Sequence, residues 1–203
     1  MIYTIGRQYG SGGKAVGEHI AKTLDIPFYD KEILAEAAKD SDYSAQILES
    51  LDEQPVSSLL YSMSIGTTNI FDVSSTMPLS VQAFLAQIKT IQRLASENES
   101  CVFVGRCADY ALRERNDLVS AFILSDDESR IATIVKRDGV TADKAAALMK
   151  RIDKNRSSYY NYYTEEKWGA AYNYDICIDS SIGIEGSAEI IIRYGEMKNK
   201  NNA

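Results

Sequence analysis

The sequence predicts an α/β protein with a parallel sheet of about five strands. Short apolar runs rich in β-branched residues alternate along the chain with longer segments whose apolar residues recur at helical spacing. A glycine-dense turn joins the first run to the first helical segment, which is typical of sheets that bind ligands at the carboxyl ends of their strands. The 203 residues suffice for one domain with a substantial core.

The N-terminal elements follow from this alternation. We expect a strand over residues 2–5, a helix over 12–24, a short strand or turn over 27–29 and a second helix over 31–39. Asp30 directly precedes the second helix. Because aspartate is a favoured N-cap residue, Asp30 is predicted to cap this helix.

Residues 41–78 form the least regular part of the sequence. Pro55, Gly66 and Pro78 interrupt this part, and few of its apolar positions recur with a clear period. We therefore predict an inserted, mobile helical subdomain here. A strongly periodic helix over residues 79–97 is expected to follow it.

The C-terminal half repeats the order of strand and helix. Asp126 and Thr141 stand at N-cap positions, so each is predicted to start a helix. We expect strands over residues 101–104, 118–124 and 175–178, and helices over 126–137, from 141 toward the tyrosines near 160, and over 184–194. The polar tail 198–203 is predicted to fray.

Composition and charge narrow the classes of function. The net charge of −7 and the pI near 4.9 argue against general nucleic-acid binding, which requires a basic face. Every apolar run is too short to cross a bilayer, so we expect no membrane partner. The three cysteines are scattered and no leader pattern precedes the first strand, which favours a cytoplasmic protein without a zinc site.

The glycine-dense turn is a candidate phosphate-binding loop. Backbone N–H groups that converge at the start of a helix favour anions. The candidate contacts are Gly10, Ser11, Gly12, Gly13 and Lys14.

The turn matches the usual signature, G-x-x-x-x-G-K-[ST], only imperfectly. If Gly13 is the second glycine, Gln8 replaces the first one and Ala15 replaces the hydroxyl residue that binds magnesium. If Gly12 is the second glycine, Gly13 replaces the lysine and Lys14 replaces the hydroxyl residue. An extra residue in the turn would restore Lys14, and the sequence leaves both registers open.

A second glycine turn follows the expected strand 101–104. Ligands bind beyond the carboxyl ends of strands, so Arg106 is a candidate phosphate or base contact and Asp109 a candidate carboxylate near magnesium. The alternative is a surface arginine and an aspartate that caps a helix.

Basic side chains are concentrated between residues 130 and 156 of this acidic protein. Arginines on a closing lid can neutralise the charge of phosphoryl transfer, which makes Arg151 and Arg156 candidates. On one helix Arg151 shares a face with Lys154, whereas Arg156 is rotated away from both. They meet one ligand only if the helix breaks or the lid folds over, and a pair of solvated helices is the alternative.

Several motifs together resemble the cytidylate kinase-like family, a branch of the P-loop nucleoside monophosphate kinases. The motifs are RQYGSGG at 7–13, PFYD at 27–30, VGRCADY at 104–110, DKNR at 153–156 with the tyrosines that follow it, KWG at 167–169 and DSS at 179–181. The resemblance covers nearly the whole chain. It implies a three-layer P-loop NTPase fold with a helical insert over 41–78 that binds the monophosphate, and an arginine-bearing lid over 137–170.

The resemblance also implies an activity and roles for single residues. In true cytidylate kinases, ATP and magnesium phosphorylate CMP or dCMP. By matching position, residues 10–14 would hold the donor phosphates. Asp30 and Arg106 would face the acceptor nucleotide, and Arg151 and Arg156 would come from the lid.

Two positions depart from the family pattern. True cytidylate kinases end the loop with lysine and serine, whereas this chain continues with Lys14 and Ala15 after its last glycine. They also carry an aspartate directly after the Gly-Arg pair, where this chain has Cys107. Asp109, two residues further on, is the candidate substitute.

We therefore expect an ATP- and magnesium-dependent kinase whose acceptor is a nucleoside monophosphate such as CMP. Catalysis would consist of positioning and charge neutralisation by magnesium and by Lys14, Arg106, Arg151 and Arg156. The alternatives are a nucleotide-binding or regulatory module without catalytic groups, and a kinase of a non-nucleotide metabolite. The sequence does not specify the oligomeric state.

Overall fold

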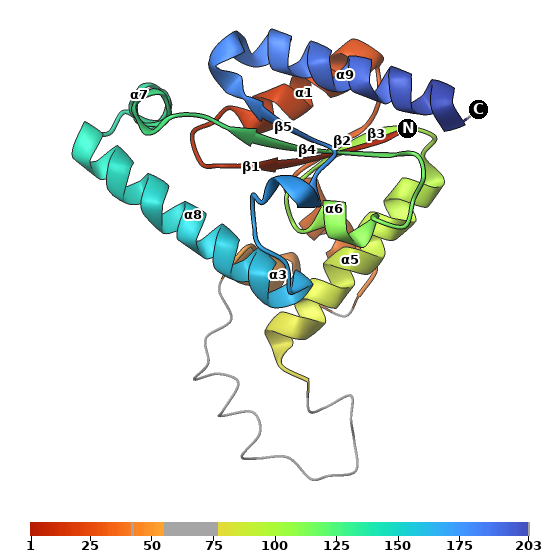
Figure 1. The fold of residues 1–203 in the computed structure, drawn as a ribbon. Coiled ribbons are helices and arrows are strands. Elements are labelled where there is room, and N and C mark those ends of the chain that lie inside the picture. Colours follow the sequence, from red (N-terminus) through yellow and green to blue (C-terminus); the bar gives the residue numbers. More distant parts are fainter. Residues whose placement is uncertain (42, 55–76, 203) are drawn as a thin grey trace.

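The computed structural model describes residues 1–41, 43–54 and 77–202. A parallel sheet lies between two layers of helices (Figure 1), which confirms the predicted α/β class. In chain order the elements are β1 (Ile2–Arg7), α1 (Gly13–Leu24), β2 (Phe28–Tyr29), α2 (Glu32–Lys39), α3 (Ala45–Leu51), α5 (Leu79–Glu97), β3 (Cys101–Val104), α6 (Ala108–Ala111), β4 (Leu118–Leu124), α7 (Asp127–Asp138), α8 (Ala142–Thr164), β5 (Ile176–Asp179) and α9 (Gly183–Asn202).

The sheet has the strand order β2-β3-β1-β4-β5, and every pairing is parallel. The central strand β1 places Ile2 opposite Cys101 of β3 on one side and opposite Leu118 of β4 on the other. All carboxyl ends therefore share one edge, where the loops after β1, β2 and β3 converge. The long helix α8 passes along this side of the molecule toward α3 (Figure 1).

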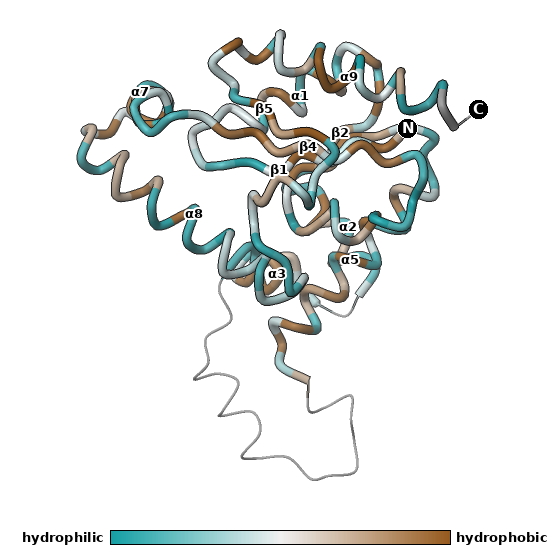
Figure 2. The backbone as a smooth tube through the Cα atoms, in the orientation of Figure 1, coloured by the Kyte–Doolittle hydropathy of each residue, from teal (hydrophilic) through white to brown (hydrophobic). Residues whose placement is uncertain are grey.

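Alternating side chains of β1 fill a separate core on each face of the sheet. Tyr3 and Ile5 pack with Ile20 of α1 and with α9, whereas Ile2 packs on the other face with Ile91 of α5. Figure 2 shows hydrophobic residues along the central strands, as expected for a sheet that is covered on both faces. Burying each large aliphatic side chain contributes roughly 1.5–3 kcal/mol, so these two cores fix the position of the loop that follows β1.

Two predicted helix caps are confirmed. The Asp126 side chain accepts a hydrogen bond from the backbone N–H of Ser129 at 2.9 Å, and Thr141 accepts one from Lys144 at 3.4 Å. These caps start α7 and α8, which carry the basic region of the sequence.

The predicted cap of α2 is wrong. The N-cap residue of this helix is Lys31, and no side chain from the described residues caps it. The Asp30 carboxylate instead contacts Lys14 at 2.9 Å and Arg106 at 3.0 Å. Two cations attract this carboxylate more strongly than one backbone N–H group does.

The last helix is longer than predicted. We expected it to end near residue 194 and the tail to fray, but α9 continues to Asn202. Lys198 lies in this extension and its Nζ atom is 2.9 Å from an oxygen of Asp175, which ties the extension to the start of β5. No helix among the described residues combines the length and apolar content needed to span a membrane.

The predicted insert, residues 41–78, is described only at its two ends. Its first part includes α3, whose Leu48 is fully buried against Leu34 and Ala37 of α2. Residues 42 and 55–76 lie outside the described residues. The chain that leads out of α3 brings residues 52 and 53 to the carboxyl edge of the sheet, where the candidate site lies.

Candidate active site

A cleft of ≈ 520 Å³ opens at the carboxyl edge of the sheet. Of the residues predicted to act, those that line the cleft are Gly10, Gly12, Gly13, Lys14, Asp30, Arg106 and Arg156. Ser11, Asp109 and Arg151 do not line it. The cleft has the position and the size of a small-molecule site in an open α/β sheet.

The loop between β1 and α1 has the backbone of an anion-binding site. Gly10 and Gly12 have φ angles of +85° and +81°, which residues with a Cβ rarely adopt. Gly12 is also the N-cap of α1, and no side chain of the described residues caps this helix. The N–H groups of the first turn and the positive end of the helix dipole are therefore directed toward the cleft.

Ser11 supports the loop from inside. Its hydroxyl lies 2.9 Å from the carbonyl oxygen of Gln8 and 3.0 Å from that of Ile123, and the residue is buried. One hydroxyl proton serves one acceptor at a time, and both carbonyls direct the group away from the cleft. A phosphate contact by Ser11 would use its backbone and remains a prediction.

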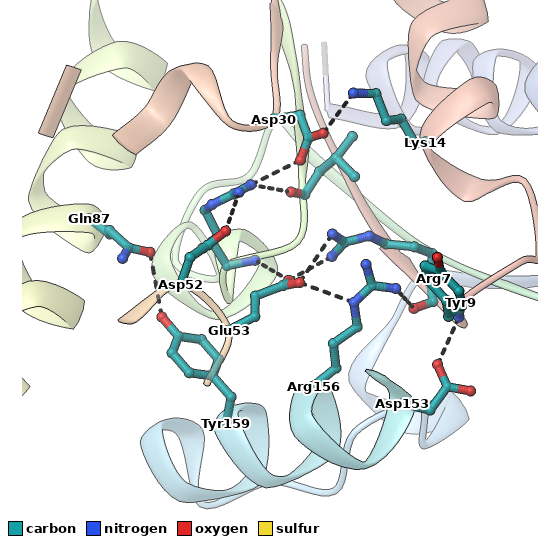
Figure 3. Close-up of polar contacts among 12 residues, drawn as sticks. Arg7, Tyr9, Lys14, Asp30, Asp52, Glu53, Gln87, Asp153, Arg156 and Tyr159 are labelled. Atoms are coloured by element: carbon teal, nitrogen blue, oxygen red, sulfur yellow. Dashed lines mark hydrogen bonds and ion pairs between the residues drawn. The ribbon is translucent and has the colours of Figure 1, made fainter. Parts of the chain in front are cut away.

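Lys14 extends from α1 toward the end of β2, away from the glycine loop (Figure 3). Its Nζ atom lies 2.9 Å from Asp30 Oδ2 and 3.8 Å from Glu18 Oε1. The hydrogen bond with Asp30 raises the pKa of Lys14, so the ammonium group stays charged. The Lys14 side chain is 54% exposed, and its contact with Asp30 places it on the Asp30 side of the cleft.

Arg106 lies on a strained turn. Gly105, Arg106 and Cys107 have φ angles of +76°, +53° and +56°, and this backbone costs on the order of 1–3 kcal/mol at each residue other than glycine. The Arg106 side chain is 2% exposed, with Nη1 3.0 Å from Asp30 Oδ1 and Nη2 2.7 Å from Asp52 Oδ2. These two buried ion pairs hold the guanidinium group and the strained turn in place.

The two carboxylates beside Arg106 respond differently to burial. Burial opposes the ionisation of Asp30, but the hydrogen bond with Lys14 and the charge of Arg106 outweigh it and lower its pKa. Burial dominates at Asp52 and raises its pKa despite the Arg106 charge. Asp30 is therefore the more firmly ionised partner of Arg106.

Glu53 is a central residue that the sequence did not indicate. Its carboxylate contacts Arg7 at 2.8 and 3.3 Å, and its Oε2 atom lies 3.0 Å from Nε of Arg156 (Figure 3). The backbone N–H of Arg106 is 3.4 Å from Oε1. Burial alone would raise the pKa of Glu53, but the charges of Arg7 and Arg156 lower it well below its usual range.

Three arginines thus surround the Glu53 carboxylate: Arg7, Arg106 and Arg156. We call these three residues the arginine cluster. They come from the end of β1, the 105–107 turn and α8. Guanidinium groups and a backbone N–H are the donors that phosphate oxygens use in proteins, and the Glu53 carboxylate takes up these donors here. Arg7 belongs to the RQYGSGG motif, but nothing in that motif shows where its side chain points.

Helix α8 is fixed to the glycine loop through Asp153. The backbone N–H of Tyr9 donates to Asp153 Oδ1 at 2.7 Å, and Arg130 contacts the other carboxylate oxygen. This attachment directs Arg156 into the cleft. Arg151 is exposed on a different face of α8, as its helical spacing from Arg156 predicts, and a role for it in the site remains a prediction.

Asp109 lies on α6, directly after the 105–107 turn, and does not line the cleft. Its Oδ2 atom accepts a hydrogen bond from the Tyr160 hydroxyl at 2.7 Å, and it lines a narrow cavity together with Glu53 and Trp168. Burial raises the pKa of Asp109 to about 6. Its contact with substrate remains a prediction.

The described residues fit nucleotide phosphates better than a metal held by the protein. The glycine loop supplies backbone donors for phosphate, whereas Ala15 has no hydroxyl group and the Ser11 hydroxyl faces two carbonyls. Among the described residues, no group of three or more His, Cys, Asp or Glu side chains is arranged to hold a metal ion. At the loop itself, neither Ala15 nor the Ser11 hydroxyl therefore offers the magnesium ligand of the usual signature.

Comparison with known proteins agrees with this geometry. The model of the cytidylate kinase-like family matches residues 2–182. The chain belongs to this family. Membership supports phosphotransferase activity in general, and no curated protein matches the chain.

Solved structures agree with the fold. An uncharacterized protein from Eubacterium ventriosum ATCC 27560 is 31% identical, with a TM-score of 0.73 and coverage of 97% of this chain and 98% of that one. A gluconokinase from Sinorhizobium meliloti 1021 is 15% identical, with a TM-score of 0.54 over 99% and 97% of the two chains. A shikimate kinase from Acinetobacter baumannii, in complex with shikimate, is 16% identical, with a TM-score of 0.51 over 98% and 93%. The two kinases share the fold of this chain, a P-loop kinase fold.

Proposed function

We propose that this protein transfers the terminal phosphoryl group of ATP to the phosphate of a nucleoside monophosphate, with CMP or dCMP as the preferred acceptor. The observation that carries this proposal is the arginine cluster beside the glycine loop, in one cleft at the carboxyl edge of the sheet. Phosphoryl transfer places negative charge on the oxygens of the moving group. Guanidinium groups fixed in advance neutralise that charge without reorganisation during the reaction.

The reaction needs little covalent chemistry from the protein. An oxygen of the acceptor phosphate forms a bond to the terminal phosphorus of ATP, and the bond from that phosphorus to the bridging oxygen breaks. The bridging oxygen keeps the electron pair and leaves with ADP. The acceptor phosphate is already anionic at neutral pH, so no general base is required and positioning by Arg106 and Arg156 supplies most of the acceleration.

The Asp30 side of the cleft is the proposed acceptor site. An ionised carboxylate only accepts hydrogen bonds, which suits the amino group of cytosine. Asp30 is held in its ionised form by Lys14 and Arg106, and both of these residues line the same cleft. Residues 137–170, which include most of α8, are the proposed lid that would exclude water once both substrates are bound.

ATP and magnesium are the proposed cofactors, as in kinases of this fold in general. The glycine loop would hold the ATP phosphates. Magnesium would arrive on the nucleotide, whose phosphates and bound water supply most of its ligands, and we assign no step to the ion. The proposed setting is the cytoplasm, with a small-molecule substrate and no nucleic-acid partner.

A coupled assay of ADP release across all common ribo- and deoxyribonucleoside monophosphates tests the proposal. CMP and dCMP are expected to give the highest kcat/KM. Arg156→Met is expected to lower kcat by a factor on the order of 1,000, because it removes a guanidinium group from the transferring phosphoryl. Turnover with every monophosphate no greater than that of Arg156→Met would contradict the proposal.

A kinase of a metabolite hydroxyl is the second candidate, and Asp30 is the observation that favours it. An ionised carboxylate at the cleft can accept the proton that a hydroxyl acceptor must lose, whereas a phosphate acceptor needs no such base. Turnover with a panel of sugars and hydroxy acids, and none with monophosphates, would support this candidate. Tight ATP binding with no turnover on either panel would favour a regulatory module.

A further inference from the structure

The structure resolves the register of the glycine loop. Helix α1 begins at Gly13, immediately after the left-handed Gly12, and the Lys14 side chain leaves the loop for Asp30. The second glycine of the signature G-x-x-x-x-G-K-[ST] is therefore Gly12. Counting from it, the lysine position falls on Gly13 and the first glycine position falls on Arg7. Compared with the usual loop, the glycine and the cation have exchanged places.

The two exchanged positions compete for one volume. A Cβ atom built on Gly13 would overlap the Cβ of Arg7 and would lie 3.1 Å from its Cγ. Only one of the two positions can therefore carry a side chain. A glycine at the first position leaves room for a lysine at the seventh, and in this chain Arg7 fills that room instead.

Arg7 lines the same cleft as Gly10, Gly12 and Gly13 of the glycine loop. The Arg7 side chain is 10% exposed, and its Nη1 atom lies 2.8 Å from Glu53, which also binds Arg156 (Figure 3). A Cβ on Gly105 would overlap Nη1 of Arg7, so a second glycine makes room for the same side chain. Lys14, by contrast, is 54% exposed and is engaged by Asp30.

We infer that Arg7, rather than Lys14, is the phosphate-binding cation of this loop, and that the phosphates of ATP displace Glu53 from it. The inference rests on the proposed ATP-dependent function. A guanidinium group can bind two phosphate oxygens through its planar fork, as it now binds both oxygens of Glu53. Glu53 then holds the place of a phosphate in the unliganded protein.

A set of paired substitutions tests this exchange of positions. Binding of ATP, and separately of inorganic tripolyphosphate, is measured by calorimetry with magnesium and without any acceptor. The variants are Arg7→Gly, Arg7→Gly with Gly13→Ala, and Arg7→Gly with Gly13→Lys. With Arg7 shortened, the nearest remaining atom to a Cβ at Gly13 is Cβ of Ile123 at 3.3 Å, which leaves the added side chain close but tolerable.

Arg7→Gly is expected to weaken both ligands about 10- to 100-fold. The double variant with Gly13→Ala is expected to bind both ligands as weakly as Arg7→Gly does, because alanine restores side-chain volume without a charge. The double variant with Gly13→Lys is expected to bind both ligands at least tenfold more tightly than Arg7→Gly does. Arg193→Met controls for the change in net charge, since Arg193 is 70% exposed and pairs with the exposed Glu196 on α9.

Three results would overturn the inference. The first is wild-type affinity in Arg7→Gly, and the second is equal affinity in the two double variants. The third is a larger loss of affinity in Lys14→Met than in Arg7→Gly. Absence of wild-type binding to both ligands would overturn it too. Thermal unfolding of each variant separates loss of the fold from loss of the ligand. Because no acceptor is used, these results are independent of whether any monophosphate is phosphorylated, so failure of the proposed acceptor and failure of this inference are distinguishable.

Discussion

Glu53 and Asp109 are two acidic residues that line one narrow cavity beside the strained 105–107 turn, and the groups that contact them differ in charge. Glu53 faces the guanidinium groups of Arg7 and Arg156, which lower its pKa well below the usual range. Asp109 has a neutral partner, the hydroxyl of Tyr160, and burial raises its pKa to about 6. The nearby cations, more than depth in the protein, decide which carboxylate is a firm anion.

The two carboxylates therefore differ in their contacts. The arginines around Glu53 are suited to bind a phosphate that replaces it, whereas the hydrogen bond that Asp109 accepts comes from a neutral hydroxyl group. The two groups also affect stability with opposite signs as the pH changes. The following variants test that contrast, starting with Arg106 in the turn itself.

Arg106→Met is expected to have the largest effect. It would leave the buried Asp30 and the half-buried Asp52 without their shared cation, and breaking a buried ion pair such as that of Arg106 with Asp30 costs about 3–5 kcal/mol of unfolding free energy. Denaturant unfolding measures the loss. The exposed control Arg193→Met should lose less than about 1 kcal/mol. Equal losses in the two variants would show that the ion pairs do not hold the turn.

Glu53→Gln is expected to have an intermediate effect. At pH 7 it should lower the unfolding free energy by about 1–3 kcal/mol, because Arg7 and Arg156 lose a charged acceptor. The folded pKa of Glu53 lies below its ordinary value of 4.5, so this stabilisation is complete above that value and is lost as the pH falls through the folded pKa.

The measurement is the difference in unfolding free energy between wild type and Glu53→Gln at pH values from 7 down to 3. The difference should shrink toward the acid end. A constant difference over this range would mean that the arginine cluster does not depend on the Glu53 charge.

Asp109→Asn is expected to have an effect of the opposite sign, a gain in stability. The folded pKa of about 6 exceeds the ordinary value of 3.8, so Asp109 favours the fold below 3.8 and this contribution is lost as the pH rises through 6. An asparagine keeps an acceptor for Tyr160 without the charge. The variant should therefore equal wild type near pH 4 and exceed it above pH 6 by up to about 3 kcal/mol, the free energy to which a shift from 3.8 to about 6 corresponds.

Unfolding free energies of both proteins at pH 4 and pH 7 provide the check. Asp109→Ala serves as the control, since it removes the acceptor for Tyr160 as well as the charge. A destabilised Asp109→Asn at pH 7 would place a cation near Asp109 and remove the contrast with Glu53.

Local sequence predicted the elements well and the site in part. Asp126 and Thr141 cap their helices as expected, because a cap depends on residues within one turn. Asp30 has the same local signal and does not cap, because Lys14 and Arg106 arrive from other elements. Local propensity therefore fails where distant charges compete for the same side chain.

The sequence alone determined the succession of strands and helices along the chain, the glycine loop and the family resemblance. All three rest on periodicity and on neighbouring residues. Only the tertiary structure decided which cations surround Glu53. Arg7 and Glu53 are 46 residues apart in the sequence, and Glu53 and Arg156 are 103 apart. No local sequence pattern encodes such contacts. The same is true of charge, because the pKa of a buried carboxylate depends on which groups the fold places around it.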